Sequence, residues 1–100
     1  MTDVTFANMR PQAWADPTAA IDFHRFSDVE IQIVGTPGGA LTPYRSFDGG
    51  TTWSATNFSD KDGNLTATVA AAGIYAIDGG CLLKITGTLA PATLFVRAGA

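Results

Sequence analysis

The amino-acid sequence predicts an all-β protein: a single antiparallel β-sandwich, immunoglobulin-like or jelly-roll-like, with an extended N-terminal segment. Two observations support this prediction. Short stretches in which apolar and polar residues alternate recur along the chain, as half-buried strands require. Clusters of Gly, Pro, Asp and Asn separate these stretches about every 8–12 residues, which is typical of sandwiches. No long segment shows a helical period of about 3.6 residues.

The length and composition indicate one folded domain. The chain has 100 residues beginning with Met1, and we expect a complete small gene product with one core. Hydrophobic residues make up 46% and charged residues 15%, a balance that excludes disorder over most of the chain. The net charge is −3 and the Lys and Arg residues are scattered, so no nucleic-acid partner is expected. A secretory signal and an apolar run of about 20 residues are both missing, so no membrane partner is expected either.

Residues 1–27 differ from the rest, and we separate them as an N-terminal strand or arm from a β-sandwich core at residues 28–100. Residues 4–9 suit a short strand, while residues 10–18 contain two prolines and suit extended or irregular chain. Two interpretations remain open. The segment either packs on the same core, or it forms an arm that reaches a neighbouring subunit with Trp14 as its anchor.

From residue 28 onward, strands and turns follow one another. Residues 29–33 alternate between apolar and polar side chains and predict a half-buried strand, which a glycine-rich segment ends. Residues 41–47 lead into a tight turn, and residues 51–56 return from it. After the next turn, residues 65–71 alternate again and predict another strand.

The last part of the chain holds three further predicted strands. Residues 74–77 form a short one that Asp-Gly-Gly ends. Residues 81–86 follow, with Leu83 and Ile85 on one face. Residues 93–97 come after the last turn, and the alternation places Leu94 and Val96 on the face opposite Phe95 and Arg97.

Residues 46–53, Ser-Phe-Asp-Gly-Gly-Thr-Thr-Trp, mark the clearest hairpin turn. Asp-Gly-Gly between strand-forming residues is a strong hairpin signal, because glycine adopts positive φ without steric cost. The Asp side chain can accept hydrogen bonds from its own downstream backbone. A large aromatic residue then suits the half-buried face of the returning strand. The residues assigned to this structural turn are Ser46, Asp48, Gly49, Gly50, Thr52 and Trp53.

The same octet resembles the Asp-box of sialidases and other β-propellers, whose pattern Ser-x-Asp-x-Gly-x-Thr-Trp it matches at every fixed position. The resemblance implies a structural hairpin in which Ser46 and Asp48 brace the turn and Trp53 packs beneath it. It does not imply a propeller, because radial closure needs about four blades or more and this chain carries one such box in 100 residues.

A second resemblance covers more of the chain. Residues 31–35, 45–53 and 72–80 resemble segments of small β-sandwich virion proteins of tailed phages. The resemblance implies a non-enzymatic capsid decoration (cement) protein that binds the outside of the phage head and stabilises it. Its partners would be major capsid protein subunits, and it would form a homo-oligomer on the particle, with a trimer as one option. The protein would be assembled in the host cytoplasm and reside on the capsid exterior of the virion.

Two alternatives to the decoration protein stay open. One is a small tail, baseplate or head accessory protein, which would have the same fold and a lower copy number. The other is a carbohydrate-binding adhesion module, which requires an exposed aromatic platform. Three aromatic residues are candidates for contact with a partner in these interpretations: Trp14, Phe47 and Phe95. Phe47 and Phe95 are expected to face outward, and an outward aromatic usually marks a contact surface.

No set of residues specifies a reaction, so we expect no enzyme, no catalytic residues, no cofactor and no metal. The loop that begins at Asp60 lacks the bidentate Glu of an EF-hand, because Val69 stands at that position. A plain hairpin turn is favoured there, with a weak Ca²⁺ site at Asp60, Asp62 and Asn64 as the alternative. Cys81 is the one cysteine of the chain and lies in an apolar run, where a buried thiol is expected.

Overall fold

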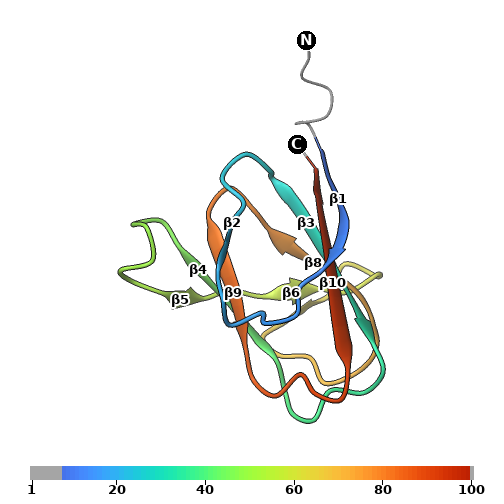
Figure 1. The fold of residues 1–100 in the computed structure, drawn as a ribbon. Helices are drawn as coiled ribbons and strands as arrows, with labels where there is room; N and C mark the ends of the chain where they lie inside the picture. Colours follow the sequence, from blue (N-terminus) through green and yellow to red (C-terminus); the bar gives the residue numbers. More distant parts are fainter. Residues whose placement is uncertain (1–7, 100) are drawn as a thin grey trace.

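Two antiparallel sheets packed face to face make up the structure, a computed structural model that describes residues 8–99 (Figure 1). The prediction of an all-β sandwich is confirmed. One sheet has six strands in the order β1-β10-β3-β8-β6-β7, and the other has four in the order β2-β9-β4-β5. The strands are β1 (Asn8–Ala13), β2 (Ile21–Asp22), β3 (Asp28–Val34), β4 (Thr42–Ser46), β5 (Ser54–Ala55), β6 (Phe58–Ser59), β7 (Leu65–Thr66), β8 (Gly73–Asp78), β9 (Leu82–Thr86) and β10 (Thr93–Gly99).

The strand pairing identifies the topology as a jelly roll. β1 pairs with β10, β2 with β9, β3 with β8 and β4 with β5, all antiparallel. Nested pairs of this kind arise when one long antiparallel ribbon is wrapped into two sheets, which is the jelly-roll arrangement. In an immunoglobulin sandwich the first strand pairs with the second instead. The jelly-roll alternative is therefore correct, and β6 and β7 extend the larger sheet beyond β8.

The core forms because the predicted alternation is real in the long strands. In β3, β9 and β10 every second side chain is buried between the sheets, and the intervening ones are exposed or partly exposed. Burial of apolar area at these positions stabilises the fold by about 25 cal/mol per Å². The largest fully buried side chains are Phe23, Phe58, Ile31, Ile33, Leu41, Leu83, Ile85, Leu94, Val29, Val96 and Pro43.

The strand predicted for residues 65–71 is mostly wrong. β7 covers two residues, and Val69 pairs with Leu41 through a single isolated β-bridge. Ala67 and Ala71 satisfy the alternating pattern but bury little apolar area, so the pattern has little energetic weight there. The partner strand β6 is also two residues long, which leaves no ladder along which the pairing could continue.

The N-terminal segment packs on the same core over its described residues, 8–27. The interpretation of Trp14 as the anchor of an arm is wrong, because its side chain is 4% exposed and lies edge-on to Phe23 at 6.0 Å between ring centroids. Its indole Nε1 donates a hydrogen bond to the carbonyl oxygen of Ala19 at 3.1 Å. A buried tryptophan with a satisfied N–H contributes a large apolar area to its own domain. Of the strand predicted for residues 4–9, only residues 8 and 9 lie in the described part of the chain, and both belong to β1.

This placement of Trp14 predicts a large loss of stability on truncation. Trp14→Ala should lower the free energy of unfolding by about 3–5 kcal/mol, because it leaves a cavity beside Phe23. Chemical denaturation followed by circular dichroism measures the change. Phe47→Ala is the control, since that aromatic side chain is 77% exposed and its loss should change stability little. Equal, small effects of both substitutions would contradict the core position of Trp14.

Candidate interaction surfaces

The turn between β4 and β5 is held by side chains of the octet. The Ser46 hydroxyl donates to Asp48 Oδ1 at 2.8 Å and accepts the backbone N–H of Gly50 at 2.9 Å. The backbone N–H of Thr52 donates to the same Asp48 oxygen at 2.8 Å. Mainly because of the Thr52 bond, the pKa of Asp48 falls from its ordinary 3.8 to about 2. These contacts fix the backbone on both sides of the turn.

The glycines and the tryptophan of the octet complete the turn. Gly49 and Gly50 have φ of 74° and 93°, a region that side-chain-bearing residues rarely adopt. The ring of Trp53 lies against Gly50, since a Cβ there would be 3.6 Å from its Cζ2 atom. Trp53 is half-buried on the outside of the four-stranded sheet and does not join the core. The turn is therefore a rigid structural element that projects from the sandwich with its hairpin (Figure 1).

The outer face of the six-stranded sheet carries most of the exposed large apolar side chains. Directly paired residues on adjacent strands share a face, so the register places Phe95 of β10 beside Gln32 of β3, and Gln32 beside Ile74 of β8. Within the described residues, five large hydrophobic side chains are exposed, and four of them lie on this face. We call these four the apolar stripe: Val34, Leu65, Ile74 and Phe95, with exposed fractions between 36% and 70%.

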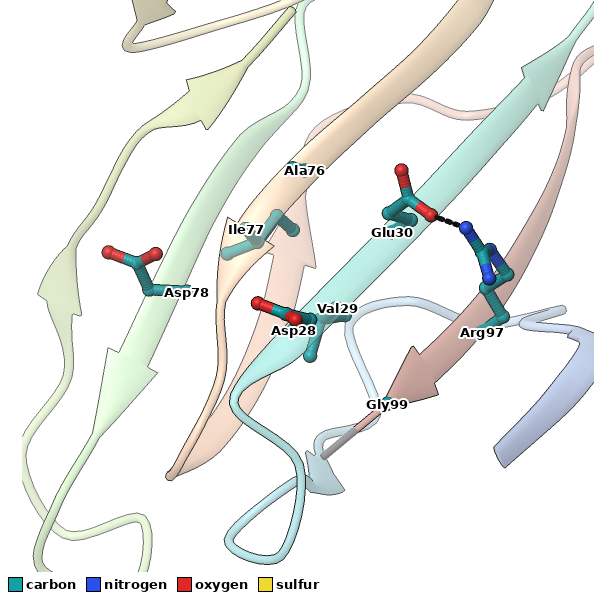
Figure 2. A pocket seen from close by; sticks show the side chains of 8 residues that line it. All are labelled: Asp28, Val29, Glu30, Ala76, Ile77, Asp78, Arg97 and Gly99. Carbon is teal, nitrogen blue, oxygen red and sulfur yellow. Dashed lines mark hydrogen bonds and ion pairs between the residues drawn. The ribbon is translucent and has the colours of Figure 1, made fainter. Parts of the chain in front are cut away.

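One end of this outer face is an acidic hollow of about 420 Å³ (Figure 2). Asp28 and Asp78 are register partners at the adjoining ends of β3 and β8. Figure 2 shows Glu30 of β3 joined to Arg97 of β10 by an ion pair, so Arg97 is already engaged inside the hollow. The apolar stripe therefore borders a rim with an excess of carboxylates.

The edges of both sheets are poorly suited to pairing with another strand. Three of the four edge strands, β2, β5 and β7, have two residues each. The fourth, β1, carries Pro11 and a register shift between Met9 and Gln12. Short length, proline and irregular register all block edge-to-edge association. A protein partner is therefore more easily accommodated on a face than on an edge.

The outer face of the four-stranded sheet carries two cation–π contacts. Lys84 of β9 lies between two aromatic side chains, with its Nζ 4.4 Å from the centroid of Trp53 and 6.0 Å from that of Tyr44. Such cation–π contacts are worth about 0.5–1 kcal/mol at exposed sites. Each contact occupies one face of its ring.

Of the three aromatic residues predicted to contact a partner, two are on the surface. Phe47 directly follows β4 and is 77% exposed, and Phe95 belongs to the apolar stripe. The structure does not bring them together, because β4 is in the four-stranded sheet and Phe95 lies on the outer face of the six-stranded one. Trp14 is buried, as described above. The apolar stripe itself was missed, because its members come from strands that are distant in sequence.

The remaining predicted sites have structural explanations. Asp60 Oδ1 accepts the backbone N–H groups of Asp62 and Asn64, each at 2.9 Å, and the bond from Asn64 is the main reason why the pKa of Asp60 is lowered. This carboxylate thus closes the turn between β6 and β7. Cys81 is buried, and burial raises the pKa of its thiol. Within residues 8–99, no group of three or more His, Cys, Asp and Glu is arranged to hold a metal ion. That part of the chain also has no helix able to cross a bilayer.

The turn at Asp48 generates a prediction about acid stability. Asp48→Ala should lower the melting temperature at neutral pH, because the Ser46 hydroxyl and the backbone N–H of Thr52 lose their acceptor. The Ser46 hydroxyl, which accepts the backbone N–H of Gly50, is then no longer held in place. The folded protein holds the carboxylate in its charged form, so its contribution is present above about pH 4 and is lost as pH falls toward about 2. The variant should therefore lose less stability across this window than the wild type.

Melting temperatures recorded between pH 7 and pH 2 test this. Asp62→Ala is the matched control, because Asp62 is exposed and takes part in its turn through its backbone. Parallel curves for wild type and Asp48→Ala across the acid window would show that the carboxylate does not stabilise the turn.

Comparison with known proteins yields a match of fold. No family model matches the chain, and no curated protein matches its sequence. Among solved structures, the SPBc2 prophage-derived protein YomS is similar, with a TM-score of 0.69 and 12% sequence identity. The similarity covers 91% of this chain and 92% of that protein. The two proteins therefore share one fold over nearly their whole lengths.

Proposed function

We propose that this chain is a non-enzymatic structural protein of a phage particle that decorates the outside of the capsid. Two independent lines support the proposal. The sequence resembles small virion proteins of tailed phages, and the fold is shared with a prophage-derived protein over most of both chains. A jelly-roll sandwich is also an architecture of viral capsid domains.

The observation that carries the proposal is the apolar stripe on the six-stranded sheet. Val34, Leu65, Ile74 and Phe95 are all exposed on one face, with Gln32 between Phe95 and Ile74, and a face that exposes several large apolar side chains favours contact with a partner. Full burial of an exposed side chain of this size is worth about 1.5–3 kcal/mol, and each stripe side chain, 36–70% exposed, gains a corresponding fraction when a partner covers it. The blunted edges leave this face as the best surface for a protein partner.

The mechanism is adhesion to major capsid protein subunits through this face. Each copy buries the stripe against the coat, and the acidic hollow favours a coat surface with a Lys or Arg near the contact. A homo-oligomer, for example a trimer, would bind several coat subunits at once. Linked contacts of this kind raise the effective concentration of each one and so strengthen weak individual binding. Assembly would take place in the host cytoplasm.

Binding to particles that lack the protein is the direct test. Purified protein is mixed with such particles, and co-sedimentation and heat-induced genome release are measured. Binding with a higher release temperature is expected. Absence of both binding and protection would refute decoration. The copy number on the native particle distinguishes a decoration protein from a tail, baseplate or head accessory protein, since an accessory protein would be present in only a few copies.

Substitutions in the stripe should weaken this binding without unfolding the protein. Ile74→Ser and Phe95→Ser should each reduce particle affinity about tenfold or more, because each removes buried apolar area from the contact. The matched control is Phe47→Ser, an exposed aromatic on the other sheet, which should leave affinity unchanged. The reverse result, with loss in Phe47→Ser alone, would move the particle contact to the hairpin.

A further inference from the structure

Phe47 combines high exposure with a fixed position. Its side chain is 77% exposed, yet both neighbours in the chain are anchored, Ser46 and Asp48 by the hydrogen bonds of the turn. The guanidinium of Arg45 lies over the ring, 5.2 Å from its centroid. At this exposure the opposite ring face is open to solvent. A rigid aromatic ring of this kind loses little conformational entropy when it binds a ligand.

Polar side chains surround the ring in two adjacent hollows, both of which Phe47 lines. One, of about 300 Å³, contains Arg45, Asp48 and the hydroxyl residues Thr52 and Ser54. The other, of about 400 Å³, contains Asp22 and His24, whose carboxylate and imidazole are 3.0 Å apart. These volumes fall at the lower end of the range for small-molecule sites.

The charges of these hollows favour an uncharged ligand. The Asp22 carboxylate has a lowered pKa, mainly because it accepts the backbone N–H of His24, and the pKa of Asp48 is about 2. Both are therefore ionised at neutral pH. Arg45 lines the same hollow as Asp48, and Arg25, whose Nε lies 3.4 Å from Nε2 of His24, is the permanent cation beside Asp22. The two carboxylates and two guanidinium groups balance, so a charged ligand gains no net attraction, while a purely apolar one would leave hydroxyl, carboxylate and guanidinium groups without partners.

We propose that the β4–β5 hairpin carries a binding site for neutral sugar rings, centred on Phe47. A pyranose ring has one face of C–H groups, which can stack on an aromatic ring, and a periphery of hydroxyls that both donate and accept hydrogen bonds. Phe47 supplies the stacking surface. Arg45 supplies hydrogen-bond donors. Further hydrogen-bond partners come from Thr52 and Ser54 if the sugar occupies the first hollow, and from Asp22 and His24 if it occupies the second.

The other aromatic residues of the surface are less suited to this role. Trp53 and Tyr44 are half-buried and have Lys84 over one ring face, and Trp14 is buried in the core. Phe95 belongs to the apolar stripe and has Ile74 and Pro11 as neighbours around a hollow of about 150 Å³. The sugar site is therefore separate from the surface proposed to bind the coat, and the isolated protein suffices to test it.

Amide chemical shifts of the ¹⁵N-labelled protein measure binding. The probes are glucose, galactose, mannose and N-acetylglucosamine, with glucuronic acid as the charged comparison. At least one neutral sugar should produce saturable shifts at residues 22–24, 45–54 and 80, and a larger response than glucuronic acid. Absence of saturable shifts with all four neutral sugars would overturn the proposal, and a preference for glucuronic acid would do so too.

Variants connect the response to the ring. Phe47→Ala should abolish the saturable shifts, whereas Phe47→Tyr should retain them because the stacking surface is kept. Phe95→Ala, an aromatic loss on the other sheet, should leave them unchanged. An unchanged spectrum away from the hairpin confirms that each variant is folded. Persistence of the shifts in Phe47→Ala would refute the assigned site.

Discussion

The ladder between β3 and β10 determines more of this molecule than any other contact. Seven residue pairs join the two strands, from Thr93 with Val34 to Gly99 with Asp28. The ladder directs Leu94 and Val96 into the core, and the same alternation directs Phe95 and Arg97 outward. A slip of one residue would exchange the two sets. The core and the surface that carries the apolar stripe are thus two results of one register.

The nested pairing explains why the N-terminal segment belongs to the core. In a jelly roll, the first strand must lie beside the last, so β1 is drawn onto β10 and the chain that follows it crosses to β2 in the other sheet. Trp14 lies on this crossing, where its backbone N–H donates to the carbonyl of Leu94 at 2.9 Å. An aromatic side chain at that point fills the end of the sandwich and has no access to a neighbouring subunit.

The sequence predicted what local physics controls. Alternation located residues 29–33, 81–86 and 93–97 because both faces of those strands differ strongly in polarity, and glycine chemistry located the turn at Asp48. Prediction from the sequence failed where contacts between distant segments determine the outcome. The burial of Trp14 depends on how the N-terminal segment packs on the core, and the extent of the strand at residues 65–71 depends on the length of its partner β6. The apolar stripe could not be read in advance, since it requires the spatial neighbourhood of β3, β8 and β10.

The position of β10 has a consequence for the order of folding. This strand lies between β1 and β3, so β1 is separated from the rest of the larger sheet until residues 93–99 are available. Until then, long strand edges and much of the hydrophobic interior stay open to water and to other nascent chains. The pairing of ends that are remote along the polypeptide also makes the closure slow, because a large loop must be ordered first. Closure of the larger sheet therefore requires residues 93–99, because β1 and β3 have no other common partner.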